Sequence, residues 1–373
     1  MEQKAPKIGT VTWISYYNLG TYLQAYALQR VVISLGYTNE IISDSKYVHS
    51  QTQSLLRKFR RSLQELVSSD RAKFSKSIQK SHYQFEDFMA NHLIVNKKWQ
   101  TFDELNKTYD IFLCGSDQIW SPILPLNPFY YLGFCHRRKI AYAPSIGVGY
   151  FPETRKKQVK GYIDSFNFLS VREAVGKKLL ESFIDKPISV VLDPTLLLDQ
   201  SEWQKLRTKN VITKKNILCY FLTFNKKYIE KIKEFSKKQN LLLSIVITDY
   251  RFLRYADIPL FIGPSEFLAE IEDATYVITD SFHGTVFSVI FKKKFLTVER
   301  FPENTSNNQN SRIHNILHQL GLVNHLIKYG MLNLEEKFPH PFNFEETSKK
   351  LSLLKRESLD YLQKALNHEA KYL

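Results

Sequence analysis

Short apolar segments alternate along the chain with stretches whose apolar residues recur at helical spacing. The first apolar segment, 7–14, is expected to be a strand, and a polar loop leads from it into a helix over 21–35 with the 3.6-residue period. Gly36 ends this helix, and a second strand is expected at 38–44. Strand, helix and strand of these lengths form a βαβ unit, which favours a parallel sheet covered by helices.

The same alternation continues in two series. Strands of the first series are expected within 109–120, 139–148, 168–173 and 188–198. Strands of the second are expected at 216–224, 241–248, 275–280 and 295–300, with helices at 228–240, 263–274, 285–292 and 311–322. Repeated apolar strands that end in polar loops and are separated by helices are typical of a doubly wound α/β fold.

A chain of 373 residues is long enough for two domains, since a single hydrophobic core stops growing below this size. We predict an N-terminal α/β domain over 1–205 and a C-terminal α/β domain over 206–335, with a linker near 199–215. A helical tail over 336–373, with a long helix at 344–371, is expected to pack back on the N-terminal domain.

A basic amphipathic insertion is expected at 51–80. Its apolar residues fall on one helical face, and its charge comes from many arginines and lysines against only Glu65 and Asp70. Such a helix can lie on an anionic membrane surface. It can equally pack on its own domain with a solvated basic face, and the sequence leaves both interpretations open.

The net charge of +15 points to an anionic partner such as a nucleic acid, an anionic lipid or a phosphorylated substrate, or to an ordinary lysine-rich surface. No nucleic-acid motif accompanies the basic residues. Cys114, Cys135 and Cys219 form no CxxC pair and are expected to be reduced, buried thiols of a cytosolic protein. We expect neither a signal peptide nor a membrane span, because no sufficiently long apolar run occurs.

Ligands of open parallel sheets bind beyond the carboxyl ends of the strands, so the loops there are candidate sites. One of them, 278–288, has the sequence ITDSFHGTVFS. Gly284 permits close approach of the backbone, His283 titrates near neutral pH, and free N–H groups at the start of a helix over 285–292 attract anions. Alternatively, Asp280 or Ser281 caps that helix and His283 is a hydrogen-bonded bystander.

Other strand-end loops add charged residues. Arg172, directly after an apolar strand, is suited to bidentate contact with a carboxylate or phosphate, or to an ion pair with Glu173. Asp117 in CGSDQIW could cap a helix, orient a sugar hydroxyl or act as a base. His314 and His318 are four residues apart, but no third zinc ligand follows. GxxxxGK[ST], GxGxxG and GxSxG are all absent, which argues against kinase-like, nucleotide-redox and hydrolase-elbow mechanisms.

Taken in order, several segments resemble the polysaccharide pyruvyl transferase family over about residues 7–322. The segments are KIGTVTW…YNLGTYLQAYALQ, YDIFLCGSDQIW, KIAYAPSIG, SVRE, VVLDPTLLL, GPSEFLAEIEDATYVITDSFHGTVFSVIF and SRIHNILHQLGL. Leu19-Gly20-Thr21 departs from the family pattern. The resemblance implies a glycosyltransferase-B-like fold, in which two Rossmann-like domains face each other across a cleft.

The resemblance also implies a reaction, in which the enolpyruvyl unit of phosphoenolpyruvate is transferred to two hydroxyls of a sugar as a cyclic ketal. The family pattern assigns His283 and Arg172 to the donor. His283 is then the expected general acid, and Asp117 would orient or deprotonate the sugar hydroxyl. Further donor-binding candidates are Ser281, Gly284, Thr285, Arg300 and Arg312; acceptor-binding candidates are Asn18, Gly20, Gly115, Ser116 and Gln118. This chemistry requires neither a metal nor a cofactor.

By analogy with the family, the acceptor is a saccharide carried on a lipid diphosphate, or its nucleotide precursor. The insertion 51–80 would then be a peripheral contact with the inner face of the cell membrane, on a cytoplasmic protein. Two other interpretations remain open. One is a sugar-nucleotide glycosyltransferase of the same architecture, with Glu299 as the candidate for ribose hydroxyls. The other is a non-catalytic scaffold that binds glycolipid through its basic surface.

Overall fold

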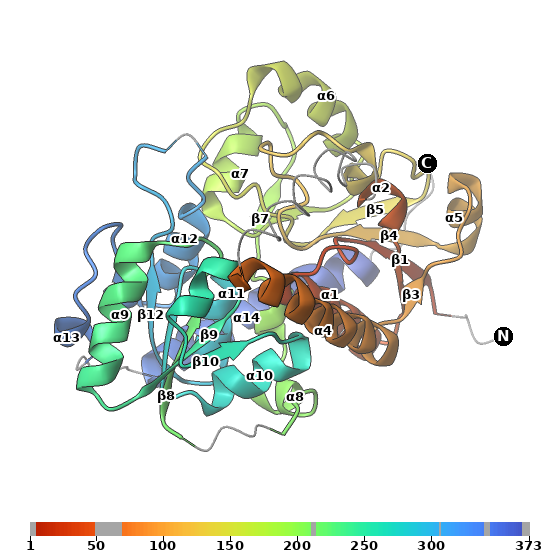
Figure 1. Ribbon diagram of the computed structural model, residues 1–373. Helices are drawn as coiled ribbons and strands as arrows, with labels where there is room; N and C mark the ends of the chain where they lie inside the picture. Colours follow the sequence, from red (N-terminus) through yellow and green to blue (C-terminus); the bar gives the residue numbers. More distant parts are fainter. Residues whose placement is uncertain (1–4, 49–68, 210–213, 306, 339–343, 368–373) are drawn as a thin grey trace.

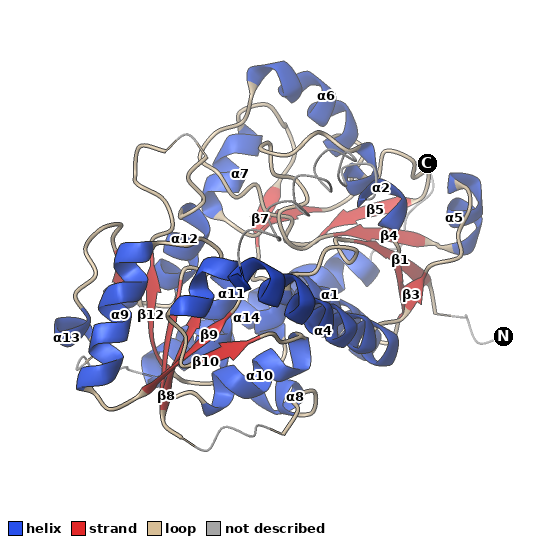
Figure 2. Ribbon diagram, in the orientation of Figure 1, coloured by secondary structure: helices blue, strands red, loops and turns tan. Residues whose placement is uncertain are grey.

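Two parallel β-sheets, each flanked by helices, stand side by side in the computed structural model of the chain (Figure 1). The structure describes residues 5–48, 69–209, 214–305, 307–338 and 344–367. Figure 2 shows the strands in two separate groups, with helices packed around and between them. The predicted fold of two Rossmann-like domains is therefore confirmed.

The first sheet has the strand order β3-β2-β1-β4-β5 and is parallel throughout. Its strands are β1 (Lys7–Val11), β2 (Thr38–Ile42), β3 (Val95–Asn96), β4 (Ile111–Cys114) and β5 (Arg138–Ala141). A bridge from Ile140 to Phe168 leads on to a small sheet of β6 (Leu169–Val171) and β7 (Ile188–Val190).

The second sheet has the order β10-β9-β8-β11-β12-β13 and is also parallel. Its strands are β8 (Asn216–Tyr220), β9 (Leu242–Val246), β10 (Ile258–Leu260), β11 (Tyr276–Thr279), β12 (Lys294–Val298) and β13 (Leu326–Ile327). In both sheets the strand order reverses at the middle, between β1 and β4 and between β8 and β11. A binding crevice is expected beyond the carboxyl ends of these strands.

Helices connect the strands. Up to residue 209 they are α1 (Leu19–Ser34), α2 (Ser45–Val48), α4 (Ser69–His92), α5 (Phe102–Thr108), α6 (Glu153–Ile163), α7 (Ala174–Glu181) and α8 (Gln200–Gln204). After it they are α9 (Lys226–Lys238), α10 (Pro264–Asp273), α11 (Phe282–Ile290), α12 (Ser311–Gln319), α13 (Leu334–Lys337) and α14 (Phe344–Asn367). Short 3₁₀ turns are η2 (Pro128–Tyr131), η3 (Pro194–Leu197), η4 (Tyr250–Arg254) and η5 (Val323–His325).

The strand predicted over 188–198 is too long. Strand β7 ends at Val190, and Pro194 opens η3. Proline has no N–H group for a sheet ladder, and the Asp193 carboxylate accepts the N–H of Thr195 at 3.0 Å, which starts the turn. The strand predicted within 139–148 is similarly short, since the chain turns at Ala143 (φ 54°) and Gly147 (φ 76°).

Helix α4 bridges the two domains. Of the predicted basic insertion 51–80, residues 51–68 lie outside the described part, and from Ser69 the helix continues to His92, beyond the predicted end. Near its start, Asp70 accepts a hydrogen bond from Arg254 at 2.7 Å, and the Phe74 ring lies 6.2 Å from Phe261. Near its end, Phe85 packs edge-on against Tyr22 of α1. Within 69–92 the apolar residues therefore serve packing.

One hydrophobic core runs through both domains. It joins Tyr26 of α1 to Trp203 of α8, with ring centres 5.7 Å apart, and Trp203 to Phe287 of α11 at 4.9 Å. Phe267 of α10 packs against Phe287 on the other side. The interface between the domains is therefore packed like the interior of a single domain. The boundary region around 199–215 contributes Trp203 to it.

The tail helix α14 packs against strand ends of the first domain. Arg138 donates to the carbonyl oxygen of Leu366 at 3.2 Å, and Tyr361 donates to that of Ala141 at 2.9 Å. Ser358 accepts the N–H of Leu192 at 2.9 Å. The helix thus covers the backbone that leads into Asp193.

The three cysteines are buried and free. Burial raises the pKa of Cys114 and of Cys219, and it raises that of Cys135 to about 11, so the thiol form is favoured at all three. Among the helices of the described ranges, none has the length and apolar character needed to cross a bilayer.

Removing the phenyl ring of Phe287, which packs at the interface between the domains, should destabilise the protein strongly. Phe287→Ala leaves a cavity among Trp203, Phe267 and Phe291, and we expect a loss of about 3–5 kcal/mol in the free energy of unfolding. Urea denaturation followed by circular dichroism measures it. Tyr83→Ala, at a side chain 74% exposed, is the matched control and should change stability by no more than about 0.5 kcal/mol. Equal effects of the two substitutions would contradict the shared core.

Candidate functional site

The loop after β11 leads directly into helix α11, which begins at Phe282 and not at Thr285 as predicted. Ser281 is its N-cap, and the Ser281 hydroxyl oxygen accepts the N–H of Gly284 at 3.3 Å. The N–H of Thr285 donates to the Ser281 carbonyl oxygen. The expected free N–H groups of Gly284 and Thr285 are therefore already engaged within the helix, and His283 lies in its first turn.

Gly284 and Thr285 have packing roles in this structure. A Cβ at Gly284 would lie 2.3 Å from the Thr279 hydroxyl oxygen, so only glycine lets α11 approach β11 this closely. The Thr285 hydroxyl is buried and lies 2.8 Å from that of Thr297 on β12. Both residues thus serve packing, and their predicted backbone contact with a donor phosphate would compete with the hydrogen bonds to Ser281.

His283 lies where helices α1 and α11 meet across the domain boundary. Asn18 caps α1 by accepting the N–H of Thr21 at 3.2 Å, and Gly20 in the first turn touches the imidazole. A Cβ at Gly20 would lie 1.9 Å from His283 Nδ1. The glycine thus makes room for a ring that is only 5% exposed. Gly20 was predicted to bind the acceptor, but here it contacts the histidine.

Asp193, after β7, is the fully buried centre of the site. Its Oδ2 accepts hydrogen bonds from Arg172 at 2.7 Å and from the Ser116 hydroxyl at 3.2 Å, and it lies 3.6 Å from His283 Nε2. Its Oδ1 accepts from the Thr195 hydroxyl and N–H. Burial by itself would raise the pKa of Asp193, but contact with His283 and the charge of Arg172 hold it well below the usual range. Asp193 is therefore a carboxylate.

Arg172, at the end of β6, is held on three sides. Its Nη1 donates to Asp193, its Nε donates to Glu173 Oε1 at 3.2 Å, and its guanidinium lies 4.2 Å from the centre of the Phe282 ring. Burial lowers its pKa, but the charges of Glu173 and Asp193 outweigh this and raise it. Of the two interpretations of Arg172, the ion pair with Glu173 is present. Its contact with a ligand anion stays a prediction, and its Nη2 is buried without a hydrogen-bond partner.

Arg312 of α12 brings a second guanidinium to Arg172. It is 7% exposed, and it donates a hydrogen bond to a neutral group, the Gln309 side-chain oxygen, at 3.1 Å. Burial, followed by repulsion from Arg172, lowers its pKa to about 10. Its Nε has no hydrogen-bond partner, and neither has His283 Nε2. A buried cation whose neighbour is another cation favours an anion beside it.

A small cavity of about 10 Å³ lies between the two domains here. It is lined by Arg172, Glu173, Leu192, Asp193, Phe282, Arg312, Asn315, Ile316 and Gln319. The space suits one water molecule or one ligand oxygen. A larger ligand at this position would have to displace the Arg312 side chain.

Asp117 lies on the N-terminal wall of the site and does not cap a helix, because a turn follows it. Its backbone is left-handed (φ 60°), and its Oδ2 accepts the Thr21 hydroxyl at 2.7 Å. Ser116 donates to Asp193, and Gln118 donates across the boundary to Gln309 at 3.2 Å. The loop after β4 thus connects α1, Asp193 and the loop that precedes α12.

Asp280 faces away from the helix it was expected to cap. Its two carboxylate oxygens accept the N–H groups of Leu222 at 2.6 Å and Thr223 at 3.1 Å, after β8. Thr223 in turn accepts from Arg300 Nε at 2.7 Å. Burial raises the pKa of Asp280 to about 6, against the opposing charge of Arg300 and these hydrogen bonds. Asp280 therefore fixes the loop that holds Arg300.

The structure brings His283, Arg172, Arg312, Asp117 and Ser116 together, whereas several other candidates stand apart or have structural roles. Gly115 approaches the carbonyl oxygen of Tyr142, where a Cβ would lie at 1.8 Å, so it serves the turn. Glu299 engages both its oxygens, with His314 Nε2 at 2.6 Å and the Tyr329 N–H at 2.8 Å. In the described ranges no group of three His, Cys, Asp or Glu side chains could hold a metal ion.

The sequence analysis did not single out Asp193, and it named Glu173 only as a possible ion-pair partner of Arg172. Both have an unremarkable local pattern: Asp193 precedes Pro194 like an ordinary turn residue, and Glu173 follows Arg172 like a salt-bridge partner. The position of Asp193 at the end of an apolar strand was the available signal, since the other candidate loops were chosen by that criterion.

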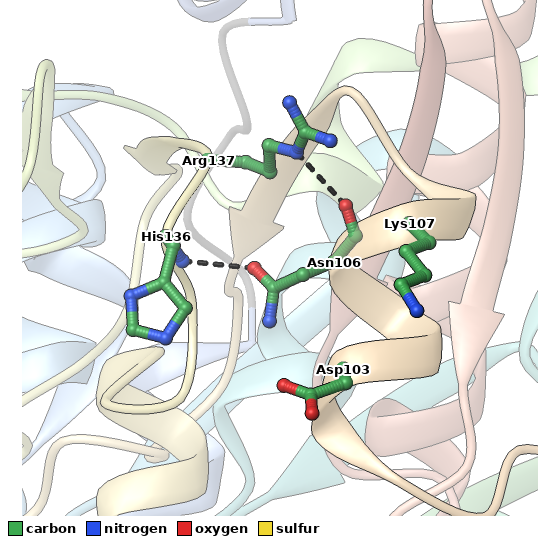
Figure 3. Close-up of a pocket in the computed structure, with 5 residues that line it drawn as sticks. All are labelled: Asp103, Asn106, Lys107, His136 and Arg137. Atoms are coloured by element: carbon green, nitrogen blue, oxygen red, sulfur yellow. Dashed lines mark hydrogen bonds between the residues drawn. The ribbon is translucent and has the colours of Figure 1, made fainter.

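A second pocket lies elsewhere, on the first domain beside α5. It has a volume of about 310 Å³ and is lined by Asp103, Asn106, Lys107, His136 and Arg137. Figure 3 shows Asn106 joined by hydrogen bonds to the backbone of His136 and to the Arg137 side chain, at 2.8 Å each. These bonds hold the 135–137 turn on α5. Since the other four side chains are solvent-exposed, the pocket is an open depression.

The family model for polysaccharide pyruvyl transferases matches residues 18–300, which include α1, Asp117, Arg172, Asp193 and His283. The chain belongs to the polysaccharide pyruvyl transferase family. The match covers strands of both sheets, from β2 to β12, and ends before Arg312. A search of curated protein sequences found no match.

Solved structures with the same fold are sugar-nucleotide enzymes. A UDP-N-acetylglucosamine 2-epimerase superposes with a TM-score of 0.52 at 12% identity, covering 99% of this chain and 98% of its own. The S. aureus MnaA–UDP co-structure gives a TM-score of 0.50 at 12% identity, covering 97% of each chain. At this identity the likeness establishes the fold alone. Within that fold, the chain is a polysaccharide-modifying transferase by its family.

Filling the space at Gly20 should disturb His283. In Gly20→Ala the new methyl group overlaps the imidazole, so the ring or helix α1 must shift, and we expect a loss of about 1–3 kcal/mol in unfolding free energy. Gly161→Ala in α6, where a Cβ meets open space, is the control and should stabilise slightly. Urea denaturation measures both, and the His283 ring signals in NMR should move in the first variant only. Unchanged ring signals in Gly20→Ala would refute the contact.

The raised pKa of Asp280 gives a pH prediction. The folded protein binds this proton more tightly than the unfolded chain, so the contribution of Asp280 to stability is fully present below pH 4 and is lost as the pH rises through 6. Asp280→Asn cannot titrate. Between pH 4 and 7, the unfolding free energy of the wild-type protein should therefore fall by about 3 kcal/mol relative to that of Asp280→Asn. Urea denaturation measures both proteins. A pH-independent difference would contradict the assignment.

Proposed function

We propose that the protein transfers the pyruvyl unit of phosphoenolpyruvate to two hydroxyls of a saccharide, forming a cyclic ketal in polysaccharide biosynthesis. Family membership supports a polysaccharide-modifying transferase, and the donor and the ketal chemistry are the proposal. The observation that carries it is the pair of buried guanidinium groups, Arg172 and Arg312, which line one cavity and each have a nitrogen without a hydrogen-bond partner. His283 lies next to this pair, since its Nε2 is 3.6 Å from the Asp193 oxygen that Arg172 binds.

The donor has anionic groups that match the guanidinium nitrogens left without hydrogen-bond partners in this cluster. Phosphoenolpyruvate carries a carboxylate and a phosphate, and guanidinium groups bind both in a planar, often bidentate manner. The Arg312 cation has a neutral partner in Gln309, so a donor anion would relieve its repulsion from Arg172. We propose that binding moves Arg312 out of the small cavity toward the anion. Arg300, held by Thr223, is a further cation beside the cleft.

The reaction balances without an oxidant or reductant. Two acceptor oxygens bond to C2 of the donor, and the C2–O bond to phosphate breaks with its electron pair leaving on phosphate. One hydroxyl proton ends on the methylene carbon, which becomes a methyl group, and the other leaves with phosphate. Protonation of that carbon creates a cationic centre, so a positioned acid is needed.

His283 is the proposed acid, and the surrounding contacts support this role. Its Nε2 has no hydrogen-bond partner and faces the carboxylate of Asp193, while Gly20 closes off the Nδ1 side. Asp193 is the proposed positioning residue for both His283 and Arg172. Asp117, which already accepts a hydroxyl hydrogen bond from Thr21, is proposed to orient an acceptor hydroxyl.

The acceptor is proposed to be a saccharide, and its attachment to a lipid diphosphate stays a prediction of the resemblance. Among the described residues, the basic part of the predicted membrane contact is Arg71, Lys73, Lys76 and Lys80 of α4. Ser281 and Gly284 remain near His283 as parts of the helix start, without a proposed ligand contact. A nucleotide-sugar donor is less well supported, because both oxygens of Glu299 are engaged within the protein.

Binding and turnover of the donor test the proposal. Calorimetry should detect phosphoenolpyruvate binding to the wild-type protein without any acceptor, weakened about tenfold or more in Arg312→Met, which keeps bulk and removes the charge. With a panel of methyl glycosides, phosphate release and a product mass heavier by one pyruvate ketal are expected. His283→Ala should lower kcat by about 10²–10⁴-fold, with donor affinity nearly unchanged.

The exposed His318 of α12 offers a matched control, and His318→Ala should keep kcat within about twofold. No detectable binding of phosphoenolpyruvate by the wild-type protein would refute the proposal. A product heavier by one hexose, formed from a nucleotide sugar, would replace it with a glycosyltransferase. Glycoside binding without turnover of either donor would favour the scaffold.

A further inference from the structure

An exposed tyrosine stands at the entrance to the site, on the loop that joins β1 to α1. Tyr16 is 55% exposed, although it lies only four residues before Gly20, which touches His283. The hydrophobic core does not require this ring, since its side chain belongs to none of the core clusters of the described residues. A large aromatic surface left open beside a polar site needs a separate explanation.

The backbone of the loop that carries Tyr16 is fixed by hydrogen bonds to a buried carboxylate. The buried carboxylate of Asp44 accepts the N–H groups of Ile14 at 3.4 Å and Ser15 at 3.1 Å. The same carboxylate accepts the Tyr130 hydroxyl at 2.9 Å. The backbone directly before Tyr16 is thus attached to the sheet through β2, so the exposed ring is presented from a rigid base.

The ring itself is supported from the side. Trp13 packs edge-on between Tyr16 and Tyr130, with ring centres 6.3 Å and 6.2 Å away and interplanar angles of 69° and 86°. This row of three aromatic rings leaves part of Tyr16 open to solvent. A tyrosine held in this way loses little conformational entropy when a flat ligand covers it.

The loop that carries Tyr16 leads directly into the site. It opens α1, where Thr21 donates to Asp117 at 2.7 Å and Gly20 touches His283. Partial burial raises the pKa of Tyr16, the charge of Asp117 raises it further, and that of Arg300 lowers it. Tyr16 is therefore within electrostatic reach of a carboxylate from the first domain and a guanidinium from the second.

We propose that Tyr16, supported by Trp13, is the platform on which the ring of the acceptor sugar stacks. The C–H face of a pyranose is apolar and matches an aromatic face, while its hydroxyls point outward to polar partners. Stacking on Tyr16 directs the edge of the sugar toward Asp117. This proposal deepens the proposed function and rests on it for the identity of the acceptor.

Saturation-transfer NMR tests the platform without any donor. The probes are the methyl glycosides of glucose, galactose, mannose and N-acetylglucosamine, together with UDP. For at least one glycoside, the signals of the ring C–H protons should fall at least about fivefold in Tyr16→Ala and persist in Tyr16→Phe, which keeps the ring. Tyr83→Ala removes another exposed tyrosine, on α4, and should leave the signals unchanged.

Two results would overturn the proposal. In the first, no glycoside gives a signal that depends on Tyr16. In the second, only the UDP signal depends on Tyr16, which would mean that the ring stacks on a nucleobase. Kinetics then separate the platform from the chemistry. With phosphoenolpyruvate and a bound glycoside, Tyr16→Ala should raise the KM for the acceptor about tenfold and leave the donor KM within twofold. Phosphate release with an unchanged acceptor KM would reject the platform and leave the proposed function standing. Tyr16-dependent glycoside binding without phosphate release would reject the donor chemistry alone.

Discussion

The arrangement of the site depends on a single buried negative charge. The carboxylate of Asp193 has no exposed surface, so its desolvation must be offset by donors that surround it. These donors come from three separate places: Ser116 after β4, Arg172 after β6, and Thr195 in η3. Each loop is held where its side chain reaches Asp193. His283 of the second domain is the remaining neighbour of this carboxylate. The carboxylate thereby sets the relative positions of residues that are distant in sequence.

The second domain can contribute to this arrangement because the domains share an interior. Trp203 and Phe287 meet as residues of one core, and α1 lies against α11 closely enough that only glycine fits at position 20. Ligand-binding folds of this type usually place a solvent-filled cleft at the switch points of their sheets. Here that region is packed and charged up to Asp117, which is only 6% exposed, whereas Tyr16 on the loop before α1 is 55% exposed. The recognition that we propose is therefore divided between a buried anion-binding part and an exposed aromatic part.

The sequence predicted the fold better than the contacts of the site. Apolar strands and the helix over 21–35 follow directly from periodicity, and the order of the two series gives the two sheets. Local chemistry limited the rest. The start of α11 was placed three residues late because Ser281 rather than a later residue satisfies the first N–H groups, and 188–198 was taken as a strand although Asp193 and Pro194 form a turn. Asp280 looked like a cap but binds the backbone of another loop.

Asp193 was missed for a physical reason. Its surroundings arise only when the ends of β4, β6 and β7 come together, and no local pattern encodes that convergence. By contrast, His283 and Arg172 were candidates because of their side-chain chemistry at strand ends, and the resemblance to the family assigned them to the donor. Gly20 illustrates the limit: a helix-start glycine has many explanations, and the facing imidazole becomes visible only in three dimensions.

Helix α4 has a mechanical consequence for the molecule. Its first turns are attached to the second domain through Asp70 and Phe74, and its last turns to α1 through Phe85. A rotation that opened the domains would have to break the contacts at one end of helix α4. We therefore expect opening of the domains to be opposed at both ends of α4, and exchange of the proposed ligands to depend on side chains and loops near the site.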